Sequence, residues 1–294
     1  MLVPKRLYGI IGDPVLHSPS PAVHNTAFQV LGIPAVFLAW QISPDMLPAA
    51  IQAVRTLKIS GVAVTLPHKE KIIPLLDLLS PEAQHMGAVN TLYWEDNKLV
   101  GHNYDAMGFM QPLQSRPPTP TALILGAGGA ARAVLGGLLS LPCIERIIVS
   151  ARRPEQAQAL ISSTWPAEID ERPGQDINQA CKLPAVETVD WTRRNDTRAD
   201  LVVNTTPIGI SAAGPAQSPL DVFQGKALAY DVVYADTPFL QAARKSGWET
   251  INGREMFIRQ ASEQFNLWTG HALPEESVVA LDKFLNLTKN SSPD

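Results

Sequence analysis

A glycine-rich loop between an apolar strand and a helix of small residues is the feature that most limits how this chain can fold. Residues 121–125 read as a continuous buried strand, and the loop Gly126-Ala127-Gly128-Gly129-Ala130 leads from it into a helix beginning near Ala131. Gly126 permits a tight turn, Gly128 lets a backbone approach a pyrophosphate, and Ala131 takes the third small position, where helix and strand pack closely. The pattern predicts dinucleotide binding; the alternative is a merely structural turn.

Further apolar strands follow this unit at the spacing of an alternating strand–helix fold. Strands are expected at 147–150, 201–204 and 228–233, and a helix at 154–162, whereas residues 165–197 are polar and irregular. Strand–helix–strand repetition indicates a parallel sheet of the Rossmann type.

A second α/β domain is expected before the loop, since the prolines at 117, 118 and 120 mark a boundary that no helix can cross. We therefore predict an N-terminal α/β substrate domain (1–111, completed by C-terminal helices within 253–294) and a doubly wound Rossmann-type domain (112–252). Within the first, we expect strands at 7–12, 36–40 and 61–65, helices at 21–31, 44–57 and mostly over 75–86, and a hairpin across Asp96-Asn97.

Composition excludes several classes of protein. The net charge is −4 and no long basic run occurs, so nucleic acid is not an expected partner. No apolar stretch is long enough to span a membrane, and the N-terminus lacks the apolar core of a signal peptide. Two cysteines, Cys143 and Cys181, make no disulfide framework, which fits a cytoplasmic protein. The scattered histidines predict no metal site.

The end of the second strand of the Rossmann domain favours NADP over NAD. NAD sites usually place an acid there for the ribose 2′-hydroxyl, but this chain has Ser150-Ala151-Arg152-Arg153. Two guanidinium groups suit a 2′-phosphate through charge-assisted hydrogen bonds. The alternative is a pair of solvated surface arginines.

Three short segments of the first domain carry groups suited to substrate chemistry. Ser18 and Ser20 lie at a helix start, where hydroxyls and free N–H groups can hold a carboxylate; alternatively, Ser20 simply caps the helix. Lys69 and Asp105 each follow a short apolar segment. Taken singly, Lys69 reads equally as a surface lysine and Asp105 as a turn or capping residue.

Together these segments resemble the shikimate/quinate dehydrogenase family over nearly the whole chain, because many motifs stand in the family's order. They are Gly12-Asp13-Pro14 with His17-Ser18-Pro19-Ser20-Pro21 and His24-Asn25; Val64-Thr65-Leu66-Pro67-His68-Lys69; Gly87-Ala88-Val89-Asn90-Thr91; Asn103-Tyr104-Asp105; the glycine loop; Asn204-Thr205-Thr206-Pro207-Ile208-Gly209; Tyr230-Asp231 with Tyr234 and Thr237-Pro238-Phe239; and Gly253-Arg254-Glu255-Met256 with Gln260-Ala261 and Trp268-Thr269-Gly270.

The resemblance implies a role for each matching residue. Lys69 and Asp105 would be the catalytic pair, and Ser18 with Ser20 would bind the carboxylate of shikimate. Other substrate contacts would come from Thr65, Asn90, Tyr234 and Gln260. The cofactor NADP would lie against Gly126, Ala127, Gly128, Gly129, Ala130, Arg152, Arg153, Asn204, Thr205, Thr206 and Gly253. The family further implies hydride exchange between shikimate and 3-dehydroshikimate in aromatic amino-acid biosynthesis, by a monomer or homodimer.

Two positions depart from the family pattern. Ala63 stands where relatives usually have Asn, and Tyr104 where they usually have Thr. The Tyr104 phenol could replace a hydrogen bond lost at Ala63, or the pocket could accept another substrate. The alternatives are therefore a family member acting on quinate or another hydroxylated carboxylic acid, and a non-catalytic NADP-binding sensor, which would have no need of Lys69 and Asp105.

Overall fold

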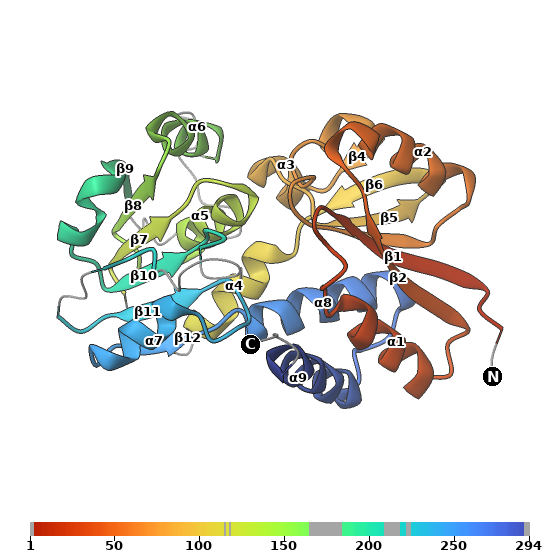
Figure 1. The fold of residues 1–294 in the computed structure, drawn as a ribbon. Helices are drawn as coiled ribbons and strands as arrows, with labels where there is room; N and C mark the ends of the chain where they lie inside the picture. The colour runs from red at the N-terminus through yellow and green to blue at the C-terminus, as the bar shows by residue number, and fades with distance from the viewer. Residues whose placement is uncertain are drawn as a thin grey trace. The chain divides into compact units, whose positions relative to one another are not determined.

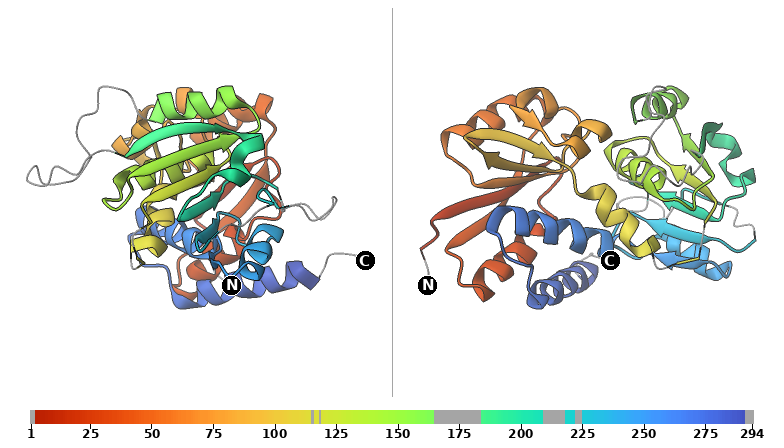
Figure 2. Two further views of the ribbon diagram at one scale, coloured as in Figure 1. Left: turned by 90° about the vertical axis from the view of Figure 1, so that its left-hand side faces the viewer. Right: turned by 180° about the vertical axis from the view of Figure 1, so that it is seen from behind.

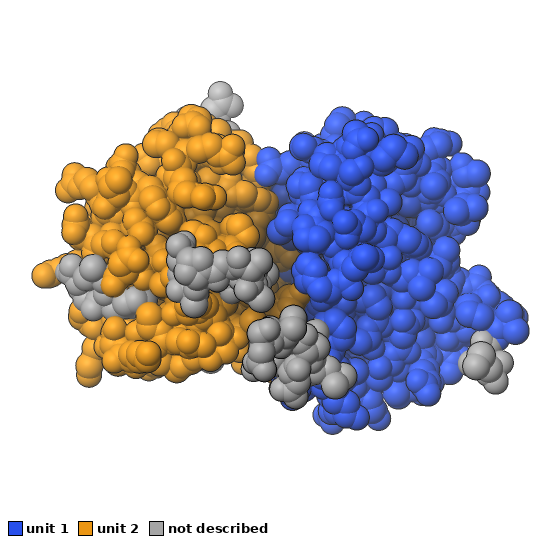
Figure 3. Space-filling model, viewed as in Figure 1, with its two compact units in different colours: residues 1–104, 258–294 blue, residues 105–257 orange. Residues whose placement is uncertain are grey.

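The computed structural model describes residues 3–114, 116–117, 119–164, 184–208, 218–221 and 225–290. The chain forms two compact units, one of residues 1–104 and 258–294 and the other of residues 105–257 (Figures 1 and 3). Each unit contains a sheet with helices, so the expected two-domain α/β class is confirmed. The helix Asp105–Gln114 (α4) belongs wholly to the second unit, although the sequence boundary was expected after residue 111.

The second unit contains a six-stranded parallel sheet of Rossmann topology, as predicted. Its strand order is β12-β11-β10-β7-β8-β9, so the chain starts in the middle, builds one half outward, and returns to build the other (Figure 2). All the carboxyl ends therefore lie at one edge of the sheet. The strands are β7 (Thr121–Leu125), β8 (Arg146–Ala151), β9 (Ala185–Asp190), β10 (Leu201–Asn204), β11 (Leu228–Asp231) and β12 (Glu249–Ile251).

Helices cover both faces of this sheet, which explains why its strands read as unbroken apolar runs. Ala122 and Ile124 of β7 face one core, shared with α4, α5 (Gly129–Ser140) and α6 (Pro154–Thr164). Leu123 and Leu125 face the other core, together with α7 (Pro238–Lys245). Strand β11 ends two residues earlier than expected, since the carboxylate of Asp231 accepts a hydrogen bond from the backbone of Val233 and turns the chain.

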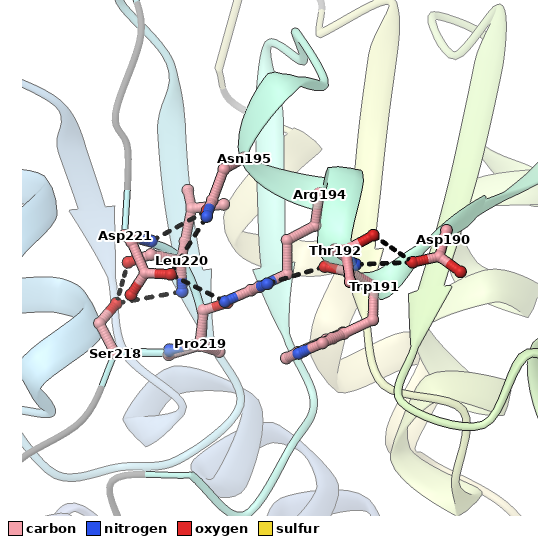
Figure 4. A network of polar contacts seen from close by, with 9 residues as sticks. All are labelled: Asp190, Trp191, Thr192, Arg194, Asn195, Ser218, Pro219, Leu220 and Asp221. Carbon is pink, nitrogen blue, oxygen red and sulfur yellow. Dashed lines mark hydrogen bonds and ion pairs between the residues drawn. The ribbon is translucent and has the colours of Figure 1, made fainter.

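The irregular stretch 165–197 contains β9 and a 3-10 helix, η3 (Trp191–Asp196), while residues 165–183 lie outside the described part. Arg194 links η3 to the connection between β10 and β11 (Figure 4). Its guanidinium donates to the carbonyls of Pro219 (2.6 Å) and Trp191 (2.7 Å), pairs with Asp221 (2.9 Å), and lies over the Trp191 ring. These contacts fasten residues 218–221, in the β10–β11 connection, to η3.

The first unit is built on a mixed sheet of order β2-β1-β3-β5-β6-β4. The predicted hairpin is present: β5 and β6 are antiparallel, and Asp96 and Asn97 both have positive φ at its turn. The strands are β1 (Arg6–Gly12), β2 (Ala35–Gln41), β3 (Gly61–Val64), β4 (Leu78–Leu79), β5 (Thr91–Glu95) and β6 (Lys98–His102).

The expectation of a mostly helical segment at 75–86 was wrong in its first half. Residues 78–79 form β4, which pairs with β6, and the short helix α3 (Pro81–Met86) begins only after it. The carboxylate of Asp77 accepts hydrogen bonds from Arg55 and from the backbone of Leu99, which draws this segment to the sheet edge. Tertiary pairing here overrides local helix propensity.

Two layers of helices cover the sheet of the first unit. On one face, the apolar side of α2 (Leu47–Thr56), preceded by the 3-10 turn η1 (Pro44–Met46), packs against Ile11, Val62 and Val64. On the other face, α1 (Ser20–Val30) and α8 (Arg254–Thr269) enclose an aromatic-rich core, and α9 (Glu275–Asn290) packs on α1. None of the helices described is long and apolar enough to cross a membrane.

His24 lies inside this aromatic core. Its ring stacks on Phe37 with centroids 4.5 Å apart and also contacts the rings of Phe265 and Trp268. Neither ring nitrogen has a hydrogen-bond partner within the described residues. Burial lowers the pKa of His24 from 6.5 to about 3.

His24 should make the protein sensitive to acid. The unfolded chain takes up a proton below its pKa of 6.5 while the folded chain does not, so stability present above that pH is lost as the pH falls toward the folded-state pKa of about 3. The loss attributable to this group is about 2 kcal/mol between pH 7 and pH 5. Denaturant unfolding at both pH values should show that His24→Phe removes this loss, while His17→Gln, at an exposed histidine, retains it. An unchanged pH slope in His24→Phe would contradict the assignment.

Candidate active site

The glycine loop has the geometry that a dinucleotide needs. Gly126 has φ of +114°, and a Cβ there would lie 2.5 Å from Oγ1 of Thr205, so only glycine fits. Its N–H donates to the carbonyl of Ser150 (2.8 Å), which ties the turn to the end of β8. By contrast, a Cβ on Gly128 would meet nothing within 4 Å. The backbone at Gly128 is thus open to an approaching group.

Helix α5 begins immediately after this open position. Gly128 is its N-cap residue and supplies no side-chain cap, so the N–H groups of the first turn point to the loop without a side-chain acceptor at the cap. Such N–H groups and the helix dipole favour a phosphate. Ala131 is fully buried, as expected of the third small position. The loop therefore fits the pyrophosphate of a dinucleotide.

The end of β8 carries Arg152 and Arg153, both exposed, directly after the buried Ser150 and Ala151. The neighbouring strand places an acid beside them that the sequence did not reveal, since Ala151 pairs with Asp190 in register. Asp190 caps η3, and its carboxylate accepts from both the backbone and the hydroxyl of Thr192, which lowers its pKa. One oxygen of the Asp190 carboxylate is thus engaged by Thr192, and the two exposed arginines supply the positive charge at the end of β8.

The motif after β10 is fixed by internal hydrogen bonds. The buried Asn204 donates to Asp231 (3.0 Å) and accepts from the backbone and hydroxyl of Thr206. Both the backbone and the hydroxyl of Thr205 donate to the carbonyl of Leu125. The three side chains thus hold the β10 turn against the glycine loop. Gly209, the last residue of the motif, lies outside the described residues.

Gly253 and Tyr234 also belong to the second unit. A Cβ on Gly253 would lie 2.1 Å from the carbonyl oxygen of Val232, so the chain passes too close there for any other residue. Tyr234 packs edge-on against Phe257 at 5.7 Å, and burial raises its pKa to about 12, so its hydroxyl remains a neutral donor.

Backbone hydrogen bonds gather the substrate motifs of the first unit. The N–H of Thr65 donates to Ile11 (3.0 Å), and that of Asp13 to Leu66 (3.0 Å), so the loops after β1 and β3 lie side by side. The carbonyl of Lys69 accepts from Val89 (2.8 Å), next to Asn90. Residues far apart in sequence are thereby brought to one end of the sheet.

Ser18 and Ser20 differ from the expected capping arrangement. Helix α1 begins at Ser20 itself with Pro19 as N-cap, because Pro19 already has helical angles, so Ser20 does not cap the helix. The Ser18 hydroxyl instead accepts from the Ser20 backbone (3.2 Å) and donates to the Ser20 hydroxyl (3.1 Å). The two hydroxyls are therefore adjacent, as joint binding of one carboxylate requires.

Asn90 is the centre of the polar network in this unit. Its side-chain oxygen accepts from the Thr91 hydroxyl (2.6 Å) and from the backbone of Tyr104 (3.1 Å). Its carbonyl accepts from Gln264 (3.1 Å), which also donates to Thr91 (2.9 Å). Sequence reasoning missed Gln264; the available signal was its place one helical turn after Gln260 on α8, since residues four apart share a helix face. Gln260 itself is half-buried.

The two catalytic candidates belong to different units. Lys69 is half-buried in the first unit. Asp105 is buried and is the first residue both of α4 and of the second unit. Asp105 follows Asn103, which donates to the Ala88 carbonyl (2.9 Å), and Tyr104, which is tied to Asn90. Of the two unusual positions, Ala63 is packed within the aromatic core of α1 and α8, whereas Tyr104 stacks on His102.

Comparison with known proteins identifies related chains along nearly the whole length. Residues 10–92 match the shikimate dehydrogenase substrate binding domain, and residues 253–280 the shikimate 5'-dehydrogenase C-terminal domain. The NADP(+)-dependent shikimate dehydrogenase of Pelobacter propionicus is 43% identical over 96% of this chain and 97% of its own. That of Oleidesulfovibrio alaskensis is 42% identical over 95% of each.

Solved structures of dehydrogenases also superpose on this chain over nearly its whole length. Shikimate 5-dehydrogenase from Thermus thermophilus, in complex with NADP(H) and shikimate, superposes with a TM-score of 0.79 at 34% identity, covering 95% of this chain and 100% of that one. Quinate dehydrogenase from Corynebacterium glutamicum, in complex with NAD, superposes with a TM-score of 0.79 at 30% identity, covering 96% and 99%.

Proposed function

Because the chain belongs to the shikimate dehydrogenase family, we propose that it is an NADP-dependent oxidoreductase that interconverts shikimate and 3-dehydroshikimate in aromatic amino-acid biosynthesis. The observation that carries the proposal is the similarity to NADP(+)-dependent shikimate dehydrogenases over 96% of the chain, at 43% identity. The retained Lys69 and Asp105 argue against a non-catalytic NADP-binding sensor.

The residues would divide the work as follows. Bound NADP(H) supplies or accepts the hydride. The Lys69 ammonium stabilises the charge that develops on the substrate oxygen during reduction and delivers a proton to it, while Asp105 orients the amine and a substrate hydroxyl. Ser18 and Ser20 bind the carboxylate, and Thr65, Asn90, Tyr234 and Gln260 contact the remaining polar groups. We assign most substrate contacts to the first unit, with Asp105 and Tyr234 contributed by the second, and NADP binding to the glycine loop, Arg152, Arg153, the β10 turn and Gly253 of the second. A cytoplasmic monomer or homodimer fits this role.

Quinate or another hydroxylated carboxylic acid is the second candidate substrate. Two observations favour it: the similarity to a quinate dehydrogenase and the unusual residues at Ala63 and Tyr104.

Steady-state assays with shikimate and with quinate, each against NADP and NAD, test the proposal. The highest kcat/KM should belong to shikimate with NADP. Turnover of quinate with negligible turnover of shikimate would transfer the assignment to the second candidate, and turnover of neither would refute both.

A further inference from the structure

Two aromatic side chains at the end of β6 form a face-to-face stack. The imidazole of His102 and the phenol ring of Tyr104 have centroids 4.1 Å apart and an interplanar angle of 14°. The His102 side chain is 17% exposed, so most of its surface is covered by the protein. A half-buried, nearly parallel contact of this kind restricts where the Tyr104 ring can lie.

The backbones of the same two residues both form hydrogen bonds with Asn90. The carbonyl of His102 accepts from the N–H of Asn90 (3.0 Å), and the N–H of Tyr104 donates to the side-chain oxygen of Asn90 (3.1 Å). The stack therefore belongs to the network that orients a proposed substrate contact, and Tyr104 immediately precedes Asp105.

Burial, reinforced by nearby acidic groups, keeps the Tyr104 hydroxyl protonated. Burial raises the pKa of Tyr104 to about 12, and the nearby Glu263, Tyr93 and Glu82 act in the same direction. The Glu82 carboxylate also lies 3.5 Å from Nε2 of His102. Burial lowers the pKa of His102, against the opposing effect of Glu82 and Glu263. At neutral pH the pair is thus a neutral imidazole on a neutral phenol that can donate a hydrogen bond.

We propose that His102 is a positioning residue for substrate binding: by stacking on Tyr104 it holds the Tyr104 hydroxyl as a hydrogen-bond donor to the substrate beside Asn90. This inference rests on the proposed function and deepens it. It makes the His102–Tyr104 stack a determinant of substrate affinity that acts through Tyr104 and not through the chemical step.

Four variants, assayed with shikimate and NADP at neutral pH, test this role. Tyr104→Phe keeps the ring and loses the donor, so KM for shikimate should rise about 3- to 10-fold, the effect of one neutral hydrogen bond. His102→Ala should raise it similarly, because the phenol is no longer held. His102→Phe, which preserves a flat stacking face, should restore KM to within about twofold of the wild-type value. In all three, kcat and the KM for NADP should change by less than about twofold, since the chemistry and the cofactor are untouched.

The double variant His102→Ala/Tyr104→Phe separates positioning from general loosening of the fold. If His102 acts only through the Tyr104 hydroxyl, the double variant should be no worse than Tyr104→Phe alone. Additive effects, a wild-type KM in His102→Ala, or a defect in His102→Phe equal to that in His102→Ala would each overturn the inference. Should His102→Ala fail to fold, His102→Gln, which keeps bulk but lacks the aromatic face, takes its place with the same expected KM. A wild-type protein inert with shikimate would instead refute the proposed substrate, and the same series with quinate would then decide whether the stack matters.

Discussion

Replacing Lys69 with alanine is expected to lower kcat by about 100-fold or more, the usual contribution of a general acid or base. In the proposed mechanism the ammonium group is needed chiefly when charge develops on the substrate oxygen, so its loss should affect turnover much more than substrate binding. Steady-state kinetics with shikimate and NADP would measure both. Lys71, two residues further along and exposed, offers a matched control, and Lys71→Ala should retain wild-type kcat.

Asp105→Asn should lower kcat to a similar extent, because the amide lacks the charge by which the carboxylate is proposed to orient the Lys69 amine. The Lys69→Ala/Asp105→Asn double variant should lose less than the sum of the two single losses, in free-energy terms, if the residues act as a unit. A Lys69→Ala enzyme with near-native kcat and only a raised KM would move Lys69 from catalysis to substrate binding.

The Rossmann unit could be predicted from sequence because its strands are buried on both faces and its loop has a steric requirement. Residues 121–125 are apolar throughout, and Gly126 adopts a φ that other residues avoid. The hairpin was predictable for a similar reason, since Asp96 and Asn97 tolerate the positive φ that its turn needs.

Elements stabilised by tertiary contacts were not predictable in the same way. Helix α4 contains Gly108 and an internal Pro112, both unfavourable in a helix, yet it forms because its buried face packs on α5. Strand β4 has two residues, too few for any periodicity, and exists by pairing with β6. Strand β9 alternates buried and exposed residues poorly, as expected at a sheet edge.

For the candidate site, too, the sequence indicates which residues are involved but not which residues they contact. The motifs make Asn90 a candidate substrate contact and mark Tyr104 as a departure from the family pattern, but they do not reveal the contacts that orient these residues. Gln264 lies 174 positions from Asn90 in the sequence, and nothing local to either residue indicates their hydrogen bond. Whether Ser20 caps α1 depends on whether Pro19 adopts helical angles, which the sequence leaves open. The chemical groups of the candidate site can thus be predicted from residue types, whereas the orientation of their side chains depends on the fold.

Removing both Arg152 and Arg153 is expected to weaken NADP binding by about 2–4 kcal/mol, given the usual strength of hydrogen bonds to charged groups and the exposure of this site. That corresponds to about a 30- to 1000-fold increase in Kd. NAD lacks the 2′-phosphate, so its affinity should hardly change, and the preference between the two cofactors should shrink by nearly the whole amount. Titration of the Arg152→Ala/Arg153→Ala variant with NADP and with NAD would measure both constants.

The position of these arginines provides the control. Arg152 and Arg153 follow the carboxyl end of β8. The exposed Arg198 instead precedes β10, so it lies toward the amino-terminal ends of the strands of the same parallel sheet. Arg198→Ala removes a positive charge from the unit without touching the end of β8, so it should leave NADP affinity near the wild-type value. If the paired variant lost affinity for NADP and NAD equally, the arginines would serve the fold or a contact shared by both cofactors. If Arg198→Ala weakened NADP as strongly as the paired variant, the effect would come from the overall charge of the unit and not from a phosphate held at the end of β8.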